Sequence, residues 1–269
     1  MLTHPLPAAR QRELLRSAEI AATAAGSRLN AATGGAVRKG AAHDVVTAAD
    51  TEAEALIRDL LIERHPGSAV LGEEYGLAGG GPLRWIIDPL DGTYNFTRGF
   101  PAFAVSIGIE HDGHPVGGCV FDPVRKELIS GSSAGLFCNG TRIAAPARPA
   151  GPPLILSDIP AAGIAADRSE YDFLQELLTI GADVRRVGST ALALAWVAIG
   201  RADLAANADV FAWDVAAGRC LVTAAGGGFA AVPELRTERP GGFVAWAPGY
   251  EATGRRLAEL VTGFSTLTE

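Results

Sequence analysis

Apolar residues recur at helical spacing in two segments of the first quarter of the chain. The first segment covers residues 8–30, where leucines and alanines fall on one face. The second starts close to residue 50 and stops before Pro66. Two pairs are spaced to cap its N-terminus, Thr51 with Glu54 and Thr47 with Asp50. The pattern therefore predicts two helices, and the sequence leaves the start of the second one open.

Short apolar runs in the next segment predict strands. Two buried strands are expected at residues 69–71 and 84–88. The segment 103–122 alternates between apolar and polar residues about Asp112-Gly113, a pair typical of a tight hairpin. Segments 127–133 and 135–143 continue the alternation, so an antiparallel meander is expected.

Strands and helices alternate after the Pro-rich stretch 145–153. The periodicity predicts strands at 154–157, 183–187, 202–207, 227–232 and 242–246, and helices at 169–180, 189–199, 214–225 and 250–261. Antiparallel strands followed by α/β alternation indicate a layered α+β or α/β protein. We expect two halves, residues 1–145 and 152–269, that pack as one compact unit.

Composition and charge narrow the range of functions. The net charge of −7 argues against nucleic acid as the main partner, because phosphate backbones attract clustered Lys and Arg. The uncharged run 191–200 is shorter than the about 20 residues that a membrane helix needs. Charged residues interrupt any signal peptide, and the three scattered cysteines form no CxxC pair, so we expect a cytoplasmic protein with reduced thiols.

Acidic residues follow several predicted strands or open predicted helices. They are Asp50, Glu73, Glu74, Asp88, Asp91 and Asp214. Each of them alone is more often a turn residue or a helix cap than a metal ligand. Together they would repel one another unless a cation lay between them, and Mg²⁺ is a hard cation that prefers such oxygen ligands.

The stretch that follows the strand at 84–88 adds features suited to phosphate. Pro89 lacks an N–H and fixes a turn that would leave the Leu90 carbonyl free as a further oxygen ligand. A helix beginning near Thr93 would present the amides of Gly92 and Thr93 to an anion. Metal-assisted hydrolysis of a phosphate ester fits these features and needs no covalent nucleophile.

These motifs resemble the inositol monophosphatase family of magnesium-dependent, lithium-sensitive phosphatases. The similarity spans most of the chain, in the family's order and approximate spacing, and rests on the segments DVVTAAD (44–50), GEE (72–74), DPLDGTYNF (88–96), RRVGSTALA (185–193) and WDVAAG (213–218). The resemblance implies an α-β-α-β-α sandwich, a homodimer, and a phosphoric monoester hydrolase that uses two to three Mg²⁺ ions.

The resemblance also implies roles at matching positions. The first magnesium would be held by Glu73, Asp88 and the Leu90 carbonyl, the second by Asp88, Asp91 and Asp214, and a weaker third one in part by Glu73, with Glu74 in support. The phosphate would be bound by the amides of Gly92 and Thr93. The attacking water would be oriented by Thr93 with Asp50 and Glu73, so that the catalytic set is Glu73, Thr93, Asp50 and Asp91. Asp91 and Asp214 would also face the substrate.

Four positions bear on the substrate. Asn207 stands where many members of this family carry a glutamate that contacts a ring hydroxyl, and Thr190 stands where alanine is frequent. Ser189 is expected either to contact the substrate or to cap a helix, and Lys39 either to approach the phosphate or to lie in a solvated loop. These departures leave the metal chemistry unchanged and bring inositol itself into question.

We expect a small polyol or sugar phosphate as the substrate, with inositol monophosphate ranked first. The alternatives are histidinol phosphate, 3′-phosphoadenosine 5′-phosphate, fructose bisphosphate and a phosphate ester of a biosynthetic pathway. A regulatory protein that binds nucleic acid or a transcription partner is the alternative from another class. Its support in the sequence is poor, because the candidate surface segments offer no basic run longer than a pair such as Arg185-Arg186.

Overall fold

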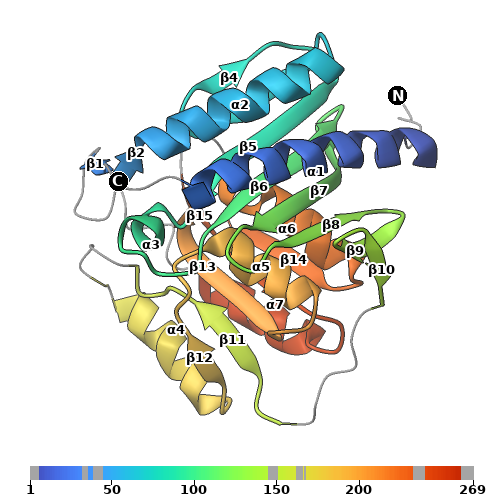
Figure 1. Ribbon diagram of the computed structural model, residues 1–269. Coiled ribbons are helices and arrows are strands. Elements are labelled where there is room, and N and C mark those ends of the chain that lie inside the picture. Colours follow the sequence, from blue (N-terminus) through green and yellow to red (C-terminus); the bar gives the residue numbers. More distant parts are fainter. Residues whose placement is uncertain are drawn as a thin grey trace.

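The computed structural model of the 269-residue chain describes residues 6–31, 36–38, 45–144, 151–161, 166, 168–232 and 240–261. These residues form five layers, helix–sheet–helix–sheet–helix (Figure 1). The α-β-α-β-α sandwich expected from the resemblance is confirmed. No helix in these ranges combines the length and the apolar character that crossing a bilayer requires.

The first layer consists of two helices that run side by side across one face of the larger sheet (Figure 1). They are α1 (Ala8–Ala31) and α2 (Ala48–Arg64), and they follow the predicted apolar faces. The start of α2 is decided by Thr47, whose side chain accepts hydrogen bonds from the amides of Ala49 and Asp50. Asp50 in turn accepts the Thr47 amide, so the cap is Thr47 with Asp50 and not Thr51 with Glu54.

The larger sheet has eight strands in the order β10-β9-β8-β7-β6-β5-β3-β4. Its strands are β3 (Ala69–Gly72), β4 (Gly76–Ala78), β5 (Leu83–Asp91), β6 (Ala104–His111), β7 (His114–Asp122), β8 (Glu127–Ser132), β9 (Gly135–Cys138) and β10 (Thr141–Ile143). The predicted hairpin is present, because β6 pairs antiparallel with β7 around Asp112-Gly113. A separate pair, β1 (Ala36–Arg38) and β2 (Val45–Thr47), precedes α2.

The central layer is made by α5 (Thr190–Ala198) and α6 (Ala212–Ala224), which contact both sheets. The smaller sheet has the order β12-β11-β13-β15-β14, with β11 (Leu154–Ser157), β12 (Asp183–Arg185), β13 (Leu204–Val210), β14 (Gly228–Val232) and β15 (Gly241–Trp246). Its outer face is covered by α4 (Arg168–Thr179) and α7 (Glu251–Val261). A short helix, α3 (Thr93–Thr97), follows β5.

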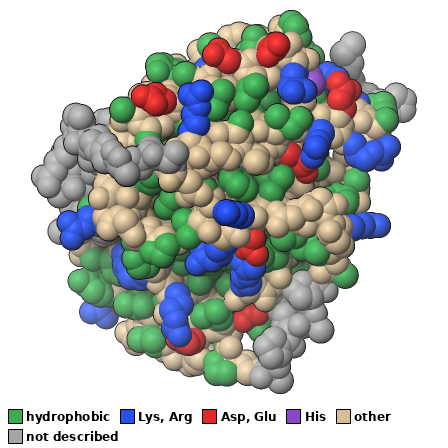
Figure 2. Space-filling model, viewed as in Figure 1, with side chains coloured by type: hydrophobic (Ala, Val, Ile, Leu, Met, Phe, Trp, Pro, Cys, Tyr) green, Lys and Arg blue, Asp and Glu red, His purple; other side chains and the backbone are tan. Residues whose placement is uncertain are grey.

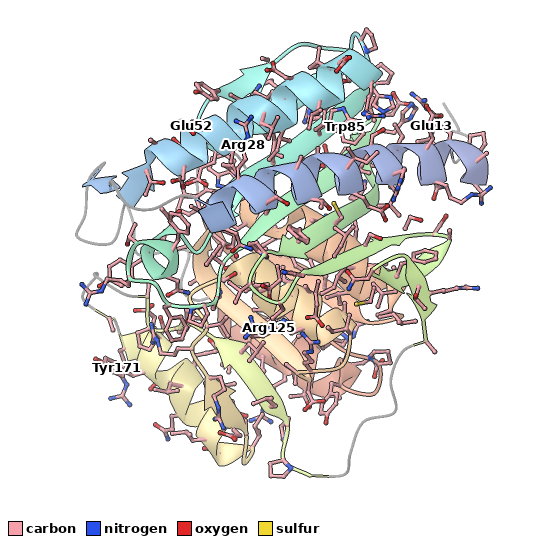
Figure 3. The ribbon with its side chains drawn as sticks, viewed as in Figure 1. Glu13, Arg28, Glu52, Trp85, Arg125 and Tyr171 are labelled. Carbon is pink, nitrogen blue, oxygen red and sulfur yellow. The ribbon has the colours of Figure 1, made fainter. Side chains whose placement is uncertain are left out.

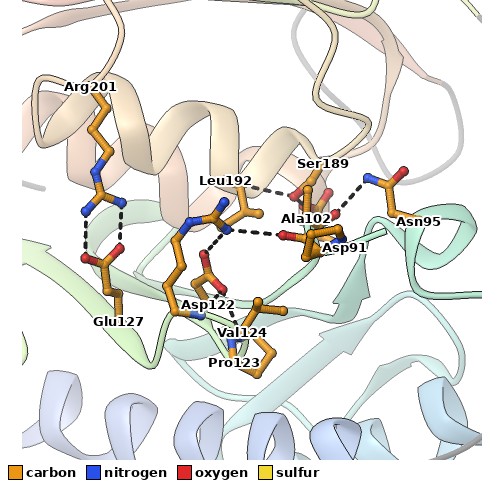
Figure 4. A network of polar contacts seen from close by, with 12 residues as sticks. Asp91, Asn95, Ala102, Asp122, Pro123, Val124, Glu127, Ser189, Leu192 and Arg201 are labelled. Carbon is orange, nitrogen blue, oxygen red and sulfur yellow. Dashed lines mark hydrogen bonds and ion pairs between the residues drawn. The ribbon is translucent and has the colours of Figure 1, made fainter. Parts of the chain in front are cut away.

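Three apolar clusters fill the spaces between the layers. Trp85, labelled in Figure 3, is fully buried in the cluster beneath α1 and α2, and its indole N–H donates to the Ser68 hydroxyl at 3.0 Å. At the surface, Arg201, which follows α5, forms two hydrogen bonds with the Glu127 carboxylate on β8, of 2.5 and 2.6 Å (Figure 4). The three apolar clusters hold the helices against the two sheets, and the acidic residues lie on these packed elements.

The two predicted halves contribute different sheets. The eight-stranded sheet draws its strands from residues 69–143 and the five-stranded sheet from residues 154–246. Most of the Pro-rich stretch proposed as their boundary lies outside the described residues. The division at 145–152 stays a prediction.

Candidate active site

A bulge in β5 brings Asp88 and Asp91 to the same face of the larger sheet. Asp88 pairs with Ser106 and Asp91 with Ala104, so two residues of β5 stand opposite one residue of β6. In a regular strand, residues three apart point to opposite faces, and the extra residue of a bulge restores a common face. The sequence predicted a strand that ends at Asp88, whereas the strand continues through the Pro89-Leu90 bulge to Asp91.

Asp91 lies at the N-terminus of α5 (Figure 4). Its carboxylate accepts the Thr190 amide at 3.0 Å, the Ala191 amide at 3.1 Å and the Ser189 hydroxyl. Ser189 is also the N-cap of α5, since its hydroxyl accepts the Leu192 amide at 3.3 Å. These contacts join the end of a strand of the larger sheet to a helix of the central layer.

Asp214 completes a compact acidic cluster. It lies in the first turn of α6 and accepts the Phe211 amide at 2.6 Å. One carboxylate oxygen from each of Asp88, Asp91 and Asp214 lies within 4.8 Å of the other two. Oxygen atoms at such spacing are a donor set suited to a hard divalent cation.

The electrostatics of this cluster are unfavourable without a cation. Burial raises the pKa of Asp88 well above its usual value, and the charges of Glu73, Asp91 and Asp214 raise it further. Burial likewise raises the pKa of Asp91 to about 6, although the Ser189 hydroxyl opposes the shift, and that of Asp214 to about 7. Carboxyl groups with such pKa values favour protons unless another positive charge replaces them.

Glu73 approaches the cluster from the neighbouring strand. It follows β3 directly, and β3 runs parallel to β5 with Gly72 opposite Ile87. The register places Glu73 beside Asp88, in agreement with the effect of its charge on the pKa of that residue. Glu74 lies next along the chain, and its amide donates to the buried Glu54 at 2.7 Å.

Thr93 and Asp50 meet beside this cluster. The Thr93 hydroxyl lies 3.0 Å from Asp50 Oδ1 and 2.9 Å from the Leu90 carbonyl oxygen, both of which are acceptors. Asp50 is 1 % exposed, and its other oxygen accepts the Thr47 amide and hydroxyl. The cap of α2 thus holds the carboxylate that orients the Thr93 side chain.

Gly92 connects β5 to α3 in a conformation that suits glycine. Its φ is 86°, and a Cβ atom built there would lie 2.9 Å from the Ala102 carbonyl oxygen and 3.1 Å from that of Gly188. Asn95 holds the same junction, because its Nδ2 lies 2.7 Å from the Ala102 oxygen and 2.8 Å from the Val187 oxygen. The backbone amides at 92–93 are therefore held against the loop that leads into α5.

A cavity of about 490 Å³ opens beside Asp91 and Asp214. Besides these two acids, its lining includes Tyr94, Phe100, Asp158, Arg186, Thr190 and Asp209. Asn207 lies in the same wall and is 4 % exposed. Its Nδ2 donates to the Thr190 hydroxyl at 2.9 Å, and its Oδ1 accepts the Asp158 amide at 2.7 Å.

The described structure thus brings together almost all residues selected from the sequence. Lys39 lies outside the described residues. Asn95 and Arg186 appeared in the sequence only as members of the motifs 88–96 and 185–193, without an assigned role, and Asp158 and Asp209 were not selected. The position of Asp158 directly after the strand at 154–157 was the one available signal.

Comparison with known proteins identifies the family of the chain. The model of the inositol monophosphatase family matches residues 5–262. An inositol-1-monophosphatase of Mycobacterium leprae is 38 % identical over 250 residues, which are 83 % of this chain and 81 % of that protein. The Nus factor SuhB of Xylella fastidiosa is 39 % identical over 186 residues, 68 % of each chain.

Solved structures show the same fold. The extragenic suppressor protein SuhB of Bartonella henselae superposes with a TM-score of 0.80 at 29 % identity, covering 93 % of this chain and 98 % of that one. The inositol monophosphatase of Anabaena superposes with a TM-score of 0.72 at 30 % identity, covering 94 % and 95 %. With its acidic site and these relatives, the chain is a phosphoric monoester hydrolase that belongs to the inositol monophosphatase family.

Proposed function

We propose that the protein is a Mg²⁺-dependent phosphatase that hydrolyses the phosphate monoester of a small polyol or sugar. The observation that carries the proposal is the convergence of Asp88, Asp91 and Asp214, each with an oxygen within 4.8 Å of the others. These acids come from β5 and α6, which are distant in sequence. No structural need of the fold accounts for such mutual repulsion, whereas a divalent cation does.

The residues present fit magnesium. All the donors are carboxylate oxygens or the Leu90 carbonyl, and hard oxygen ligands are those that Mg²⁺ prefers. We assign Glu73, Asp88 and Leu90 to one ion and Asp88, Asp91 and Asp214 to a second, with Glu73 contributing to a weaker third. When bound, such ions neutralise phosphate oxygens and lower the pKa of a coordinated water.

The side chains around the cluster have distinct roles in this proposal. The Thr93 hydroxyl, 3.0 Å from Asp50, would accept a proton from the attacking water and pass one to the Asp50 carboxylate. Glu73 assists in orienting that water. The water oxygen forms the new bond to phosphorus while the bond to the alcohol oxygen breaks, and the departing alkoxide takes up a proton from a solvent water.

The phosphate is bound by the amides of Gly92 and Thr93 in this proposal. The close approach of the Gly92 backbone to Ala102 and Gly188 keeps these amides in place. Thr190 and Asn207 contribute to the wall on the alcohol side, and Lys39 is proposed to approach the phosphate. Because Ser189 both caps α5 and donates to Asp91, its contribution to binding the substrate is indirect.

A phosphate-release assay tests the proposal. The chain is assayed in Mg²⁺ and again in EDTA with inositol 1-phosphate, histidinol phosphate, 3′-phosphoadenosine 5′-phosphate and fructose 1,6-bisphosphate. We expect metal-dependent release that is fastest with inositol 1-phosphate. A folded protein that releases phosphate from none of these esters would contradict the proposal.

A regulatory role in transcription is the second candidate, because one relative is named a Nus factor. The basic pair that would support this role already has partners within the protein. Arg185 pairs with Asp183, and Arg186 donates to the Asp158 and Pro160 carbonyls. On the face shown in Figure 2, basic and acidic side chains are interspersed. A regulator would tolerate Asp91→Asn and Asp214→Asn in its biological function, whereas a phosphatase would not.

Oligomeric state and location complete the proposal. We propose a homodimer, as the resemblance implies, and light scattering after size exclusion tests it by giving twice the 27.8 kDa chain mass. A reducing cytoplasm suits the three cysteines, none of which forms a disulfide.

A further inference from the structure

Most polar groups that line the cavity beside the acidic cluster are already engaged within the protein. Asp158 accepts the Gly188 amide at 3.1 Å, and Asn95 donates to backbone carbonyls. Arg186 donates through Nη2 to the carbonyls of Asp158 and Pro160, at 2.9 and 2.8 Å. These contacts build the wall of the cavity and reduce what it can offer to a ligand.

Asn207 is engaged on both sides of its amide group. Its oxygen accepts the Asp158 amide and its nitrogen donates to Thr190, while the side chain is buried. A hydroxyl of a bound alcohol would have to compete with these contacts. Asn207 therefore shapes the cavity by positioning Thr190 and the 158 loop.

Asp209 differs from the residues around it. It lines the same cavity, is exposed, and within the described residues its carboxylate forms no hydrogen bond or ion pair. The charge of Glu170 raises the pKa of Asp209, and the charge of Asp209 raises the pKa of Asp214, so both of these neighbours are acids. Its carboxylate is therefore an acceptor on the cavity wall that forms no ion pair with any described Lys or Arg.

A second bulge gives Asp209 this position. Asn207 pairs with Phe243 and Val210 with Gly241, so Ala208 and Asp209 stand opposite one residue of β15. The bulge places Asp209 at a φ of 60°, a left-handed conformation that few residues other than glycine, asparagine and aspartate adopt readily. Bulges next to active sites commonly redirect a side chain, and this bulge interrupts the regular alternation of side chains along β13 at Asp209.

We propose that Asp209 selects the leaving alcohol by accepting a hydrogen bond from one of its hydroxyl groups. The inference rests on the proposed phosphatase function and assigns to Asp209 the recognition that Asn207 is not free to provide. Asp209 is thus a specificity residue for polyol phosphates.

Two variants and two esters test this inference. Inositol 1-phosphate carries hydroxyls beside the ester, whereas p-nitrophenyl phosphate carries none. We expect Asp209→Gly to lower the ratio of kcat/KM for inositol 1-phosphate to that for p-nitrophenyl phosphate by about tenfold, mainly through KM, as expected for a lost hydrogen bond to a charged group. Asp209→Asn keeps an acceptor oxygen and should lower the ratio less.

Asp112→Asn is the matched control. Asp112 is an acid with a φ of 51° in the β6–β7 turn, away from this cavity, and its variant should keep the wild-type ratio. The melting temperature of Asp209→Gly should not fall, because glycine suits a positive φ. A wild-type ratio in both Asp209 variants overturns the inference and leaves the phosphatase intact. A wild-type protein that hydrolyses neither ester overturns both.

Discussion

At the scale of single residues, the site consists of acids that repel one another in a buried place. Asp88 is 1 % exposed and Asp91 is 7 % exposed, and Asp214 has an oxygen close to both. The fold holds them together because their backbones belong to a strand and a helix fixed by packing between the layers. The buried acids therefore destabilise the metal-free folded state, and together they form a binding site for cations.

Asp88→Asn tests this conflict. The variant removes a charge from the centre of the cluster, so the metal-free protein at pH 8 should melt about 2–4 °C higher, the shift that about 1 kcal/mol causes at this chain length. Its phosphatase activity in Mg²⁺ should fall by more than about 100-fold. Replacing a residue that only hydrogen-bonds to a metal ligand already lowers activity by up to about 100-fold, and Asp88 is proposed as a ligand itself. Calorimetry in EDTA and phosphate release in Mg²⁺ measure the two effects. Unchanged turnover would contradict the assignment.

Thr93→Val tests the proposed path of the proton. The variant keeps the shape of the side chain but loses the hydroxyl that lies 3.0 Å from Asp50. We expect kcat to fall by about 10²–10⁴-fold with little change in the affinity for Mg²⁺. Thr97→Val removes an exposed hydroxyl of the same helix, which donates to the Tyr94 carbonyl at 2.9 Å, and serves as the control. Equal kcat values for the two variants would exclude this role of Thr93.

At the scale of secondary structure, the positions of the longer helices and strands could be predicted from the sequence, whereas the three-residue strands β1, β2 and β4 were not predicted. Burial of one face imposes a period on each helix and strand, and that period is visible in the residues. The bulges at Pro89-Leu90 and Ala208-Asp209 could not be predicted, because a bulge depends on which residues of two strands pair. Without the bulge at Pro89-Leu90, Asp88 and Asp91 would lie on opposite faces. The sequence therefore predicts which acids matter but not the backbone geometry that brings them together.

The N-terminus of α5 offers a test at this scale. Ser189→Ala removes the cap of the helix and one of the hydrogen bonds that orient Asp91. We expect a loss of about 1 kcal/mol in the free energy of unfolding, typical of a lost N-cap. The Kd for Mg²⁺ should rise by about 10-fold, as is typical when a hydrogen bond to a metal ligand is removed. Denaturant unfolding and titration calorimetry measure the two quantities.

Ser27→Ala is the control for this comparison. The Ser27 hydroxyl is exposed in α1 and donates to the Thr23 carbonyl at 2.7 Å, far from any acid of the cluster. Its variant should keep the wild-type affinity for Mg²⁺. If Ser189→Ala also keeps that affinity, the contact between α5 and Asp91 serves stability alone.

At the scale of the whole molecule, the site forms where the two sheets and the central helices meet. One set of residues lies between positions 50 and 93, and the other between 189 and 214. Spacing in the sequence does not predict this meeting, and it was expected here only through the family resemblance. Asp158 and Asp209 remained unrecognised because a single acid in a loop or at a strand end carries no periodic signal.

The stability of the metal-free protein should depend on pH. Asp91 has a folded-state pKa of about 6 and Asp214 of about 7, both above the value of about 3.9 for an unfolded aspartate. The folded state therefore binds protons more tightly, and the resulting stabilisation is lost as the pH rises through 6 and 7. In EDTA, these two groups should lower the melting temperature between pH 5.5 and pH 8, and Mg²⁺ should restore it at pH 8. Asp88→Asn should weaken this dependence.

The most direct test of the account is a crystal of the protein grown with Mn²⁺, examined by anomalous diffraction at the manganese edge. We predict anomalous peaks between the carboxylates of Asp88, Asp91 and Asp214 and beside Glu73, with none in crystals of Asp88→Asn. A wild-type crystal whose cluster holds no peak at saturating Mn²⁺ would contradict the claim that these acids exist to bind divalent cations.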